Sequence, residues 1–147
     1  VIVRANSGIR TLQDLEGKRF AVQVSSKPDE ILLNHEDARI PEVDEIYCFS
    51  TLDEVYACLR KGYCDAIAGH ESALRLFMDS LPNEFYMLEE SLYKSELGVA
   101  FEKGTQEELA NELSKTLQQM HQDGTTERIL AKYGINTDCA WSDAYAE

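Results

Sequence analysis

Three polar residues in this sequence, Ser25, Ser26 and Lys27, directly follow the apolar run "RFAVQV" and precede a segment that favours a helix. Two hydroxyl groups, a lysine and the unpaired N–H groups of a helix start favour binding of an anionic group. Gln23, near the end of the apolar run, is placed to line the floor of such a site. A plain helix cap accounts for the same residues. The local pattern therefore leaves anion binding and capping both open.

A second polar turn, made of Gly69, His70 and Glu71, follows the apolar run "AIA" in the same way. The glycine permits a close approach of the backbone, and we expect the histidine or the glutamate to point toward a ligand at the passage from strand to helix. A capping glutamate beside an exposed histidine is the alternative.

Signatures of common catalytic sites are missing from the sequence. It contains no GxSxG turn, no glycine-rich phosphate loop and no HExxH helix. A catalytic pair, with the Cys64 thiol as nucleophile and His70 as its base, is disfavoured because the two residues lie at opposite ends of one predicted strand. We therefore expect a non-enzymatic protein without a cofactor, and an enzyme on the same fold is the less favoured alternative.

The four cysteines are Cys48, Cys58, Cys64 and Cys139. They show neither CxxC pairs nor the Cys/His spacing of a zinc site, so no metal is expected. Cys58 and Cys64 are close enough in sequence to close a small disulfide loop, but buried free thiols are equally compatible with their positions.

The charge balance limits the partners of the chain. It has 147 residues with 14 Lys and Arg against 27 Asp and Glu, a net charge of −13. Such a charge repels nucleic-acid phosphates and anionic lipid surfaces. The length suits one domain with its own core, and no stretch has the roughly 20 apolar residues that a membrane-spanning helix needs. The first residues also lack the apolar stretch of a signal peptide.

Short apolar runs alternate with amphipathic segments along the chain. Capping residues, glycines and the spacing of apolar residues predict helices from residue 28, over about 51–62, over 71–81, from about 105 to 124 and over about 125–133. Strands are predicted at 1–4, 19–24, 45–49, 65–69, 84–90 and 95–104. Alternation of this kind predicts an α/β fold with a mainly parallel sheet flanked by helices. Ligands of such sheets bind at the carboxyl ends of the strands.

Three stretches resemble the family 3 extracellular solute-binding proteins, the polar amino-acid receptors of ABC importers. They are "TLQDLEGKRFAVQ" at 11–23, "CLRKGYCDA" at 58–66 and the segment 98–134, which begins "GVAFEKG" and ends "KYG". The resemblance extends from Val1 to about Tyr133. It implies a type II periplasmic-binding-protein-like lobe.

Members of that family have two α/β lobes joined by crossing strands. By resemblance, residues 1–104 correspond to lobe 2 with crossing strands at 1–4 and 97–101. Residues 105–147 correspond to C-terminal helices and a tail that normally associate with lobe 1, whose N-terminal part has no counterpart in this sequence. Because that surface would be uncovered, we expect the fragment to self-associate.

The resemblance also assigns roles to the two polar turns. Ser25 and Ser26 match the family's carboxylate-binding turn. The position after Gly69 matches an aspartate that receives the ligand's α-ammonium group, and here it is His70, with Glu71 as the only adjacent carboxylate. The implied function is an extracytoplasmic receptor for a small polar solute, amino-acid-like or carboxylate, that serves an ABC permease. A ligand-sensing module of a membrane signalling protein is the alternative.

Overall fold

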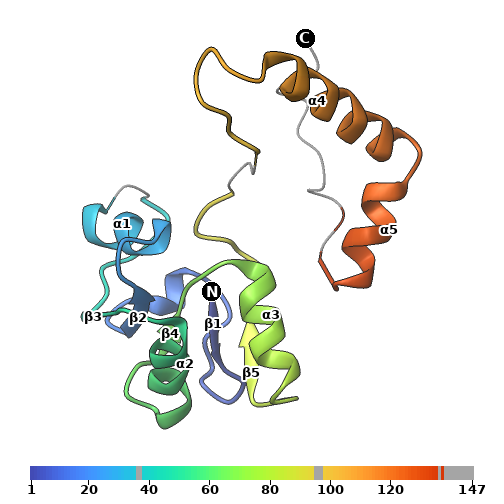
Figure 1. The fold of residues 1–147 in the computed structure, drawn as a ribbon. Helices are drawn as coiled ribbons and strands as arrows, with labels where there is room; N and C mark the ends of the chain where they lie inside the picture. The colour runs from blue at the N-terminus through green and yellow to red at the C-terminus, as the bar shows by residue number, and fades with distance from the viewer. Residues whose placement is uncertain (36–37, 95–97, 136, 138–147) are drawn as a thin grey trace. The chain divides into compact units, whose positions relative to one another are not determined.

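The computed structural model describes residues 1–35, 38–94, 98–135 and 137. It divides into two compact units, Val1–Lys94 and Ser95–Glu147 (Figure 1). The boundary lies ten residues before the one that the resemblance implies. Leu97, in the expected second crossing strand, lies outside the described residues, and residues 98–101 form no strand. The assignment of the two segments to lobes stays a prediction.

The first unit is built on a five-stranded sheet in the order β3-β2-β4-β1-β5. Its strands are β1 (Ile2–Arg4), β2 (Arg19–Gln23), β3 (Glu45–Phe49), β4 (Ala66–Ile67) and β5 (Phe85–Met87). β2 pairs in parallel with β3 and β4, whereas β1 is antiparallel to β4 and β5. Four strands therefore point the same way and only β1 runs against them. The sheet is mixed, and the predicted α/β class is confirmed.

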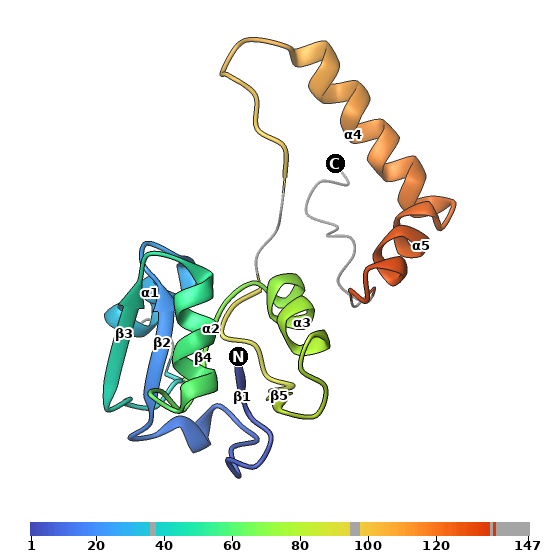
Figure 2. The same cartoon turned by 60° about the horizontal axis from the view of Figure 1, so that its bottom comes forward.

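Helices cover both faces of this sheet. They are α1 (Lys27–Asn34), α2 (Leu52–Lys61) and α3 (Glu71–Asp79), with a short 3₁₀ helix η1 (Gln13–Leu15). Side chains alternate between faces along β2: Phe20 packs in one cluster with Leu32 of α1, and Ala21 packs in another with Leu59 of α2. α3 belongs to the second cluster through Leu74. Figure 2 shows α3 beside β1 and β5.

The helix boundaries follow from local signals. The Ser26 side chain accepts from the Asp29 amide at the start of α1. Thr51 and Glu54 form a capping box at the start of α2, where each side chain pairs with the other residue's backbone N–H. Gly62 ends α2 with φ 75°, a left-handed conformation that suits glycine. These boundaries agree with the sequence prediction to within two residues.

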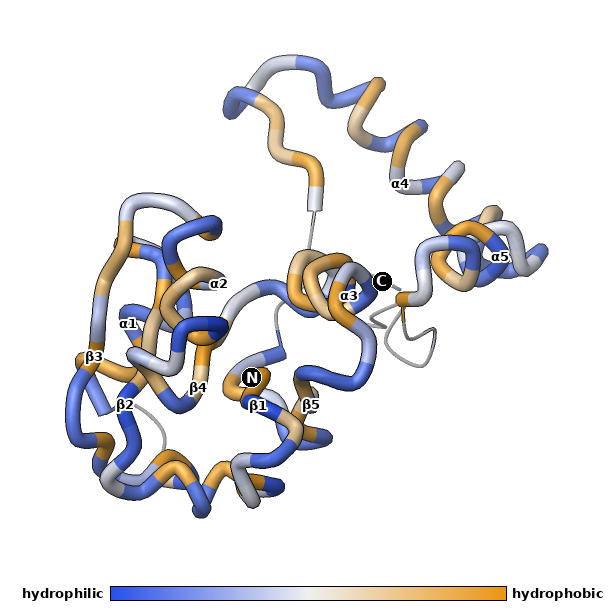
Figure 3. Tube along the Cα trace, turned by 90° about the horizontal axis from the view of Figure 1, so that it is seen from below, coloured by the Kyte–Doolittle hydropathy of each residue, from blue (hydrophilic) through white to orange (hydrophobic). Residues whose placement is uncertain are grey.

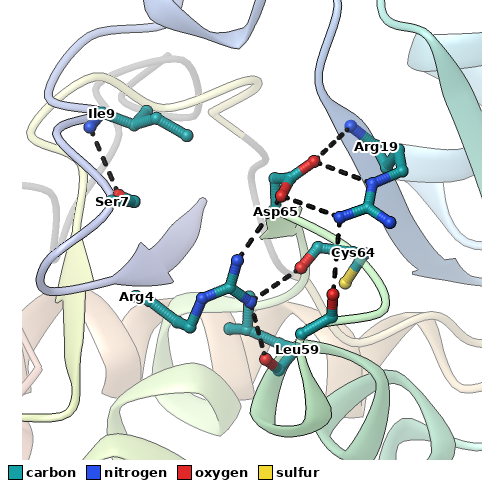
Figure 4. Close-up of polar contacts among 8 residues, drawn as sticks. Arg4, Ser7, Ile9, Arg19, Leu59, Cys64 and Asp65 are labelled. Carbon is teal, nitrogen blue, oxygen red and sulfur yellow. Dashed lines mark hydrogen bonds and ion pairs between the residues drawn. The ribbon is translucent and has the colours of Figure 1, made fainter.

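A cluster of charged residues lies at the end of the sheet where β2 and β4 begin (Figure 4). The Asp65 carboxylate accepts from the Arg19 amide and from its guanidinium, each at 3.1 Å. Arg4, at the end of β1, donates to the carbonyls of Leu59 and Cys64 at 3.0 and 2.9 Å. Two strands and the turn after α2 are thereby tied together. The aspartate in "CLRKGYCDA" is therefore a structural residue.

The second unit contains α4 (Glu107–Gln122) and α5 (Thr125–Lys132), joined at Gly124 with φ 75°. Hydrophobic and hydrophilic residues alternate along α4 (Figure 3). Neither helix has a buried residue. None of the described helices combines the length and the apolar character that a membrane crossing requires.

Candidate functional site

The two polar turns lie at the same edge of the sheet. β2 and β4 are neighbouring parallel strands, paired at Phe20 with Ala66 and at Ala21 with Ile67. A further bond from the Ala68 amide to the Ala21 carbonyl, at 3.4 Å, extends the pairing toward this edge. The serine turn after β2 and the histidine turn after β4 therefore leave the sheet side by side. We call this the carboxyl edge.

Inside the serine turn, a buried carboxylate already takes one of the backbone donors. Ser25 has φ 59°, and its amide donates to Oδ2 of Asp29 at 2.8 Å. Asp29 is 7% exposed and its own amide donates to the Ser26 hydroxyl oxygen at 3.4 Å. The Ser26 amide donates to the Gln23 carbonyl at 3.2 Å.

These bonds narrow what the serine turn offers to a ligand. The Ser25 and Ser26 amides are used within the turn, and Pro28 has no N–H to offer. The Ser25 hydroxyl has no hydrogen-bond partner among the described residues, and its side chain is exposed. The role of the turn as an anion site stays a prediction, and it now depends on this hydroxyl and on Lys27.

Asp29 is the residue of the edge that the sequence analysis missed. Its second oxygen, Oδ1, accepts from the Cys48 thiol on β3 at 3.2 Å. Burial and this aspartate raise the pKa of the Cys48 thiol, which keeps it protonated as the donor. The Ser-x-x-Asp spacing from residue 26 is a capping signal that points to Asp29, but it does not reveal the bond to Ser25.

Two other predicted residues, Lys27 and Gln23, are held in place by neighbours. The Lys27 ammonium lies 3.0 Å from Oε2 of Glu30 and 5.7 Å from the ring centre of Tyr93. The Gln23 side chain donates to the Ser50 carbonyl at 3.1 Å, so it ties the end of β2 to the chain before α2. Both side chains have exposed or partly exposed surface at the edge.

The histidine turn is more open than the serine turn. His70 is the N-cap of α3, is exposed, and makes no side-chain bond to the helix. α1 and α2 have side-chain caps at this edge, and α3 has none. The Glu71 carboxylate is exposed and lies 2.7 Å from the Arg75 guanidinium. This pairing with Arg75 competes with the role of Glu71 as a substitute ammonium partner.

The backbone conformation at residue 69 does not require a glycine. Its φ is outside the left-handed range, and an added Cβ would meet Leu74 at 3.5 Å, an ordinary contact distance. A role of Gly69 in the close approach of a ligand to the backbone therefore stays a prediction.

Two hollows of the first unit lie away from the carboxyl edge. A hollow of about 340 Å³ lies between α2 and α3, beside Tyr56 and Phe77, and a second of about 300 Å³ lies near Arg4 and Glu84. Neither includes a residue of the two turns. No group of three or more potential metal ligands occurs in the described part of the chain. The edge thus offers hydroxyl, ammonium, imidazole and amide groups for binding.

Solved structures similar to this chain are substrate-binding proteins. An ancestral arginine-binding protein bound to arginine is 27% identical with a TM-score of 0.65, and one bound to glutamine is 25% identical with a TM-score of 0.67. Each match covers 90% of this chain and 57% of that chain. The second substrate-binding domain of a putative amino acid ABC transporter from Streptococcus pneumoniae has the same fold, with 23% identity, a TM-score of 0.70 and coverage of 90% and 58%.

This chain therefore spans less than two thirds of the length of the solved structures that it matches. A search of curated proteins finds no match. The family model described as "ABC transporter, phosphonate, periplasmic substrate-binding protein" matches residues 1–143. Since that match spans nearly the whole chain, and the fold is that of a type II periplasmic-binding-protein lobe, the chain belongs to the family of periplasmic substrate-binding proteins of ABC transporters, which are not enzymes.

Proposed function

We propose that this chain supplies one ligand-binding lobe of an extracytoplasmic receptor that delivers a small polar solute to an ABC permease. The proposal depends on one observation at the carboxyl edge: the serine turn and the histidine turn follow neighbouring parallel strands. Sites of open parallel sheets lie at such an edge, and type II receptors close a second lobe over it. The family description supports a periplasmic location.

The chemistry of the edge favours an anionic group on the solute. The serine turn presents the Ser25 hydroxyl and the Lys27 ammonium, which is paired with Glu30. Ser26 and Gln23 shape the turn and its floor. At the histidine turn, the amides of the first turn of α3 lack a side-chain cap. Helix N-terminal amides favour negative charge. An anion between the two turns would meet donors from both.

In this proposal His70 and Glu71 contact the polar part of the solute that is not the anionic group. Gly69 allows the backbone to come close to the solute. By resemblance, His70 replaces an aspartate that holds an α-ammonium group, and Glu71 is paired with Arg75. A solute without a free α-ammonium group is therefore the better fit. The phosphonate description of the family agrees with an anionic solute, whereas the solved arginine- and glutamine-bound proteins favour an amino acid.

Calorimetric titration of a chain that carries both lobes tests the assignment. The panel contains methylphosphonate, succinate, arginine and glutamine. We expect an anionic solute to bind most tightly, and Ser25→Ala to weaken it roughly tenfold or more, because a hydrogen bond to a charged group is lost. The matched control is Ser80→Ala at the far end of α3, where the hydroxyl bonds to the Phe77 carbonyl.

Equal affinities in the Ser25→Ala and Ser80→Ala variants for every bound solute would remove the serine turn from the site. Tight binding of arginine or glutamine, with neither methylphosphonate nor succinate bound, would reject the anionic preference.

A further inference from the structure

Asp29, near the start of α1, is the only charged residue that is buried in the described part of the chain. Its Oδ2 accepts from the Ser25 amide at 2.8 Å, and its Oδ1 accepts from the Cys48 thiol at 3.2 Å. No described lysine or arginine forms an ion pair with it. Burial of a carboxylate without a cation costs free energy, and hydrogen bonds offset only part of that cost. Asp29 therefore places an uncompensated negative charge at the serine turn.

The other charged side chains of the carboxyl edge do not cancel this charge. The Lys27 ammonium lies 3.0 Å from the Glu30 carboxylate, so the two form a pair without net charge. At the histidine turn, Glu71 and Arg75 form a second such pair at 2.7 Å. The edge thus has hydrogen-bond donors for an anion, but Asp29 adds a negative charge that neither pair compensates.

This carboxylate lies close to the group that would bind the anion. The Ser25 hydroxyl oxygen is within about 4 Å of the amide nitrogen of the same residue, and that nitrogen is 2.8 Å from Oδ2 of Asp29. An anion that accepts from this hydroxyl therefore lies within roughly 9 Å of the carboxylate. That is about one Debye length at physiological salt, and a buried charge is screened less than an exposed one. Each negative charge on the solute should therefore weaken binding several-fold, up to about tenfold.

We propose that Asp29 is a specificity-determining residue that limits the anionic group of the solute to a single negative charge. A carboxylate, a sulfonate or a singly protonated phosphonate gains the donors of the edge and meets the repulsion once. A doubly charged phosphonate gains the same donors and meets twice the repulsion. Asp29 acts through its field and through Ser25, without touching the solute. The inference rests on the proposed function, because it concerns the charge of the solute at the same site.

The test compares methylphosphonate with methanesulfonate, which have similar tetrahedral head groups but differ in charge at alkaline pH. Calorimetric titration uses a chain with both lobes and Cys48→Ser, so that no thiolate forms beside the turn at this pH. In Asp29→Asn, the side-chain oxygen still accepts from the Ser25 amide, and the NH₂ group can donate to the hydroxyl at position 48. We expect Asp29→Asn to tighten binding of methanesulfonate about threefold and of methylphosphonate about tenfold, because the gain grows with the charge of the solute.

The matched control is Asp53→Asn in the same background. Asp53 is exposed in the first turn of α2, at the same edge, and its side chain makes no hydrogen bond to any described residue. Solvent screens its charge, so the ratio of the two affinities should change by less than about twofold. Equal gains for the two probes in Asp29→Asn, or an unchanged ratio, would overturn the proposal.

Titration of the chain without substitutions tests the proposal even where Asp29→Asn folds poorly. As pH rises, methylphosphonate loses its second proton, whereas the charge of methanesulfonate stays the same. Methanesulfonate therefore reports the change that comes from the titratable groups around the turn, which are Lys27, Glu30, Cys48 and His70. We expect the ratio of affinities to shift several-fold toward methanesulfonate.

The outcomes separate this inference from the proposed function. Binding of both probes with no shift in their ratio, or with a shift toward methylphosphonate, would overturn the role of Asp29 and leave the anion site standing. If neither the parent nor Asp29→Asn binds either probe, both the anionic preference of the proposed function and the inference are rejected.

Discussion

The two units of this chain have similar amphipathic helices but very different burial. Every buried hydrophobic side chain of the described residues lies between Ile2 and Leu92. α4 and α5 have apolar residues at helical spacing, yet Leu117 is 40% exposed and Ile129 is 45% exposed. An apolar stripe thus predicts a helix in both units, but it becomes a core only where a sheet is present to receive it.

The two units differ in whether their apolar side chains form a core. In the first unit, strands of alternating pattern give α1 and α2 opposite faces to cover. In the second unit, α4 contacts α5 through one short junction, and neither helix buries a residue. The first unit therefore contains a core of its own, whereas the described residues of the second unit form none.

The sharpest test of this contrast compares Phe20→Ala in β2 with Leu117→Ala in α4. Phe20 is 0% exposed, so its truncation should lower the free energy of unfolding by about 3 to 5 kcal/mol. Truncation of the exposed Leu117 should change it by less than about 0.5 kcal/mol. Chemical denaturation followed by circular dichroism measures both. Comparable losses in the two variants would show that α4 belongs to the same cooperative core.

A second test asks whether binding at the carboxyl edge is independent of the core. His70 is exposed and makes no capping bond, so His70→Asp should leave the core intact and raise the free energy of unfolding by about 0.5 to 2 kcal/mol, because aspartate caps a helix start. In a chain with both lobes, the added carboxylate should strengthen binding of an amino acid with a free α-ammonium by about 1.5 to 3 kcal/mol, the gain of a charge-assisted hydrogen bond.

The measurement is calorimetric titration with arginine and with methylphosphonate. The matched control is Asn83→Asp, an equal charge change at the opposite end of α3. A gain for arginine that is the same in both variants would mean that net charge, and not the position of residue 70, decides the affinity.

The fold was predictable from sequence because its signals are local. Ser26, Thr51 and Gly62 set helix ends through their own backbone contacts, and the apolar alternation of β2 sets two faces. The direction of β1 was not predictable from pattern, since an apolar run reads the same in a parallel and an antiparallel strand. The resemblance implied a crossing strand at residues 1–4 but did not give its direction.

The place of the two polar turns in the sheet was predictable from sequence, whereas their hydrogen-bond contacts were predictable only in part. Strand ends placed Ser25 and His70 at one edge, and the sheet confirms that these ends are neighbours. Sequence could not show that Asp29 turns back onto the Ser25 amide, because that bond depends on a left-handed residue at Ser25. Nor could it show the pairing of Glu71 with Arg75 in preference to a ligand.

Asp65→Asn weakens the end of the sheet opposite to the carboxyl edge. Hydrogen bonds from Arg19 hold the pKa of Asp65 below its usual value of 3.8. Because the folded state lowers this pKa, the stabilisation is present above about pH 4 and is lost as pH falls through the folded value. The variant should lose about 1 to 2 kcal/mol near neutral pH, a figure reduced for the partial exposure of the cluster.

Unfolding free energies of the parent and the Asp65→Asn variant, measured from neutral pH down to about pH 3, should converge as the carboxyl group is protonated. A difference that stays constant over this range would mean that the variant acts through packing rather than through charge.

The smallest expected effect concerns the apolar stripe of α4, formed by Leu113, Leu117 and Met120. None of these three residues is buried and Leu117 is 40% exposed, so two copies of the chain are expected to associate through this face. A net charge of −13 opposes association, so we expect a weak dimer that strengthens as salt screens the charge. Sedimentation at increasing protein concentration, in low and high salt, measures this association.

Leu117→Glu should shift the equilibrium to monomer, whereas Gln118→Glu adds the same charge beside the stripe and should have a much smaller effect. A strict monomer at high protein and salt concentration would show that unit 2 satisfies its own apolar face, and the contrast between the two units would then be one of degree.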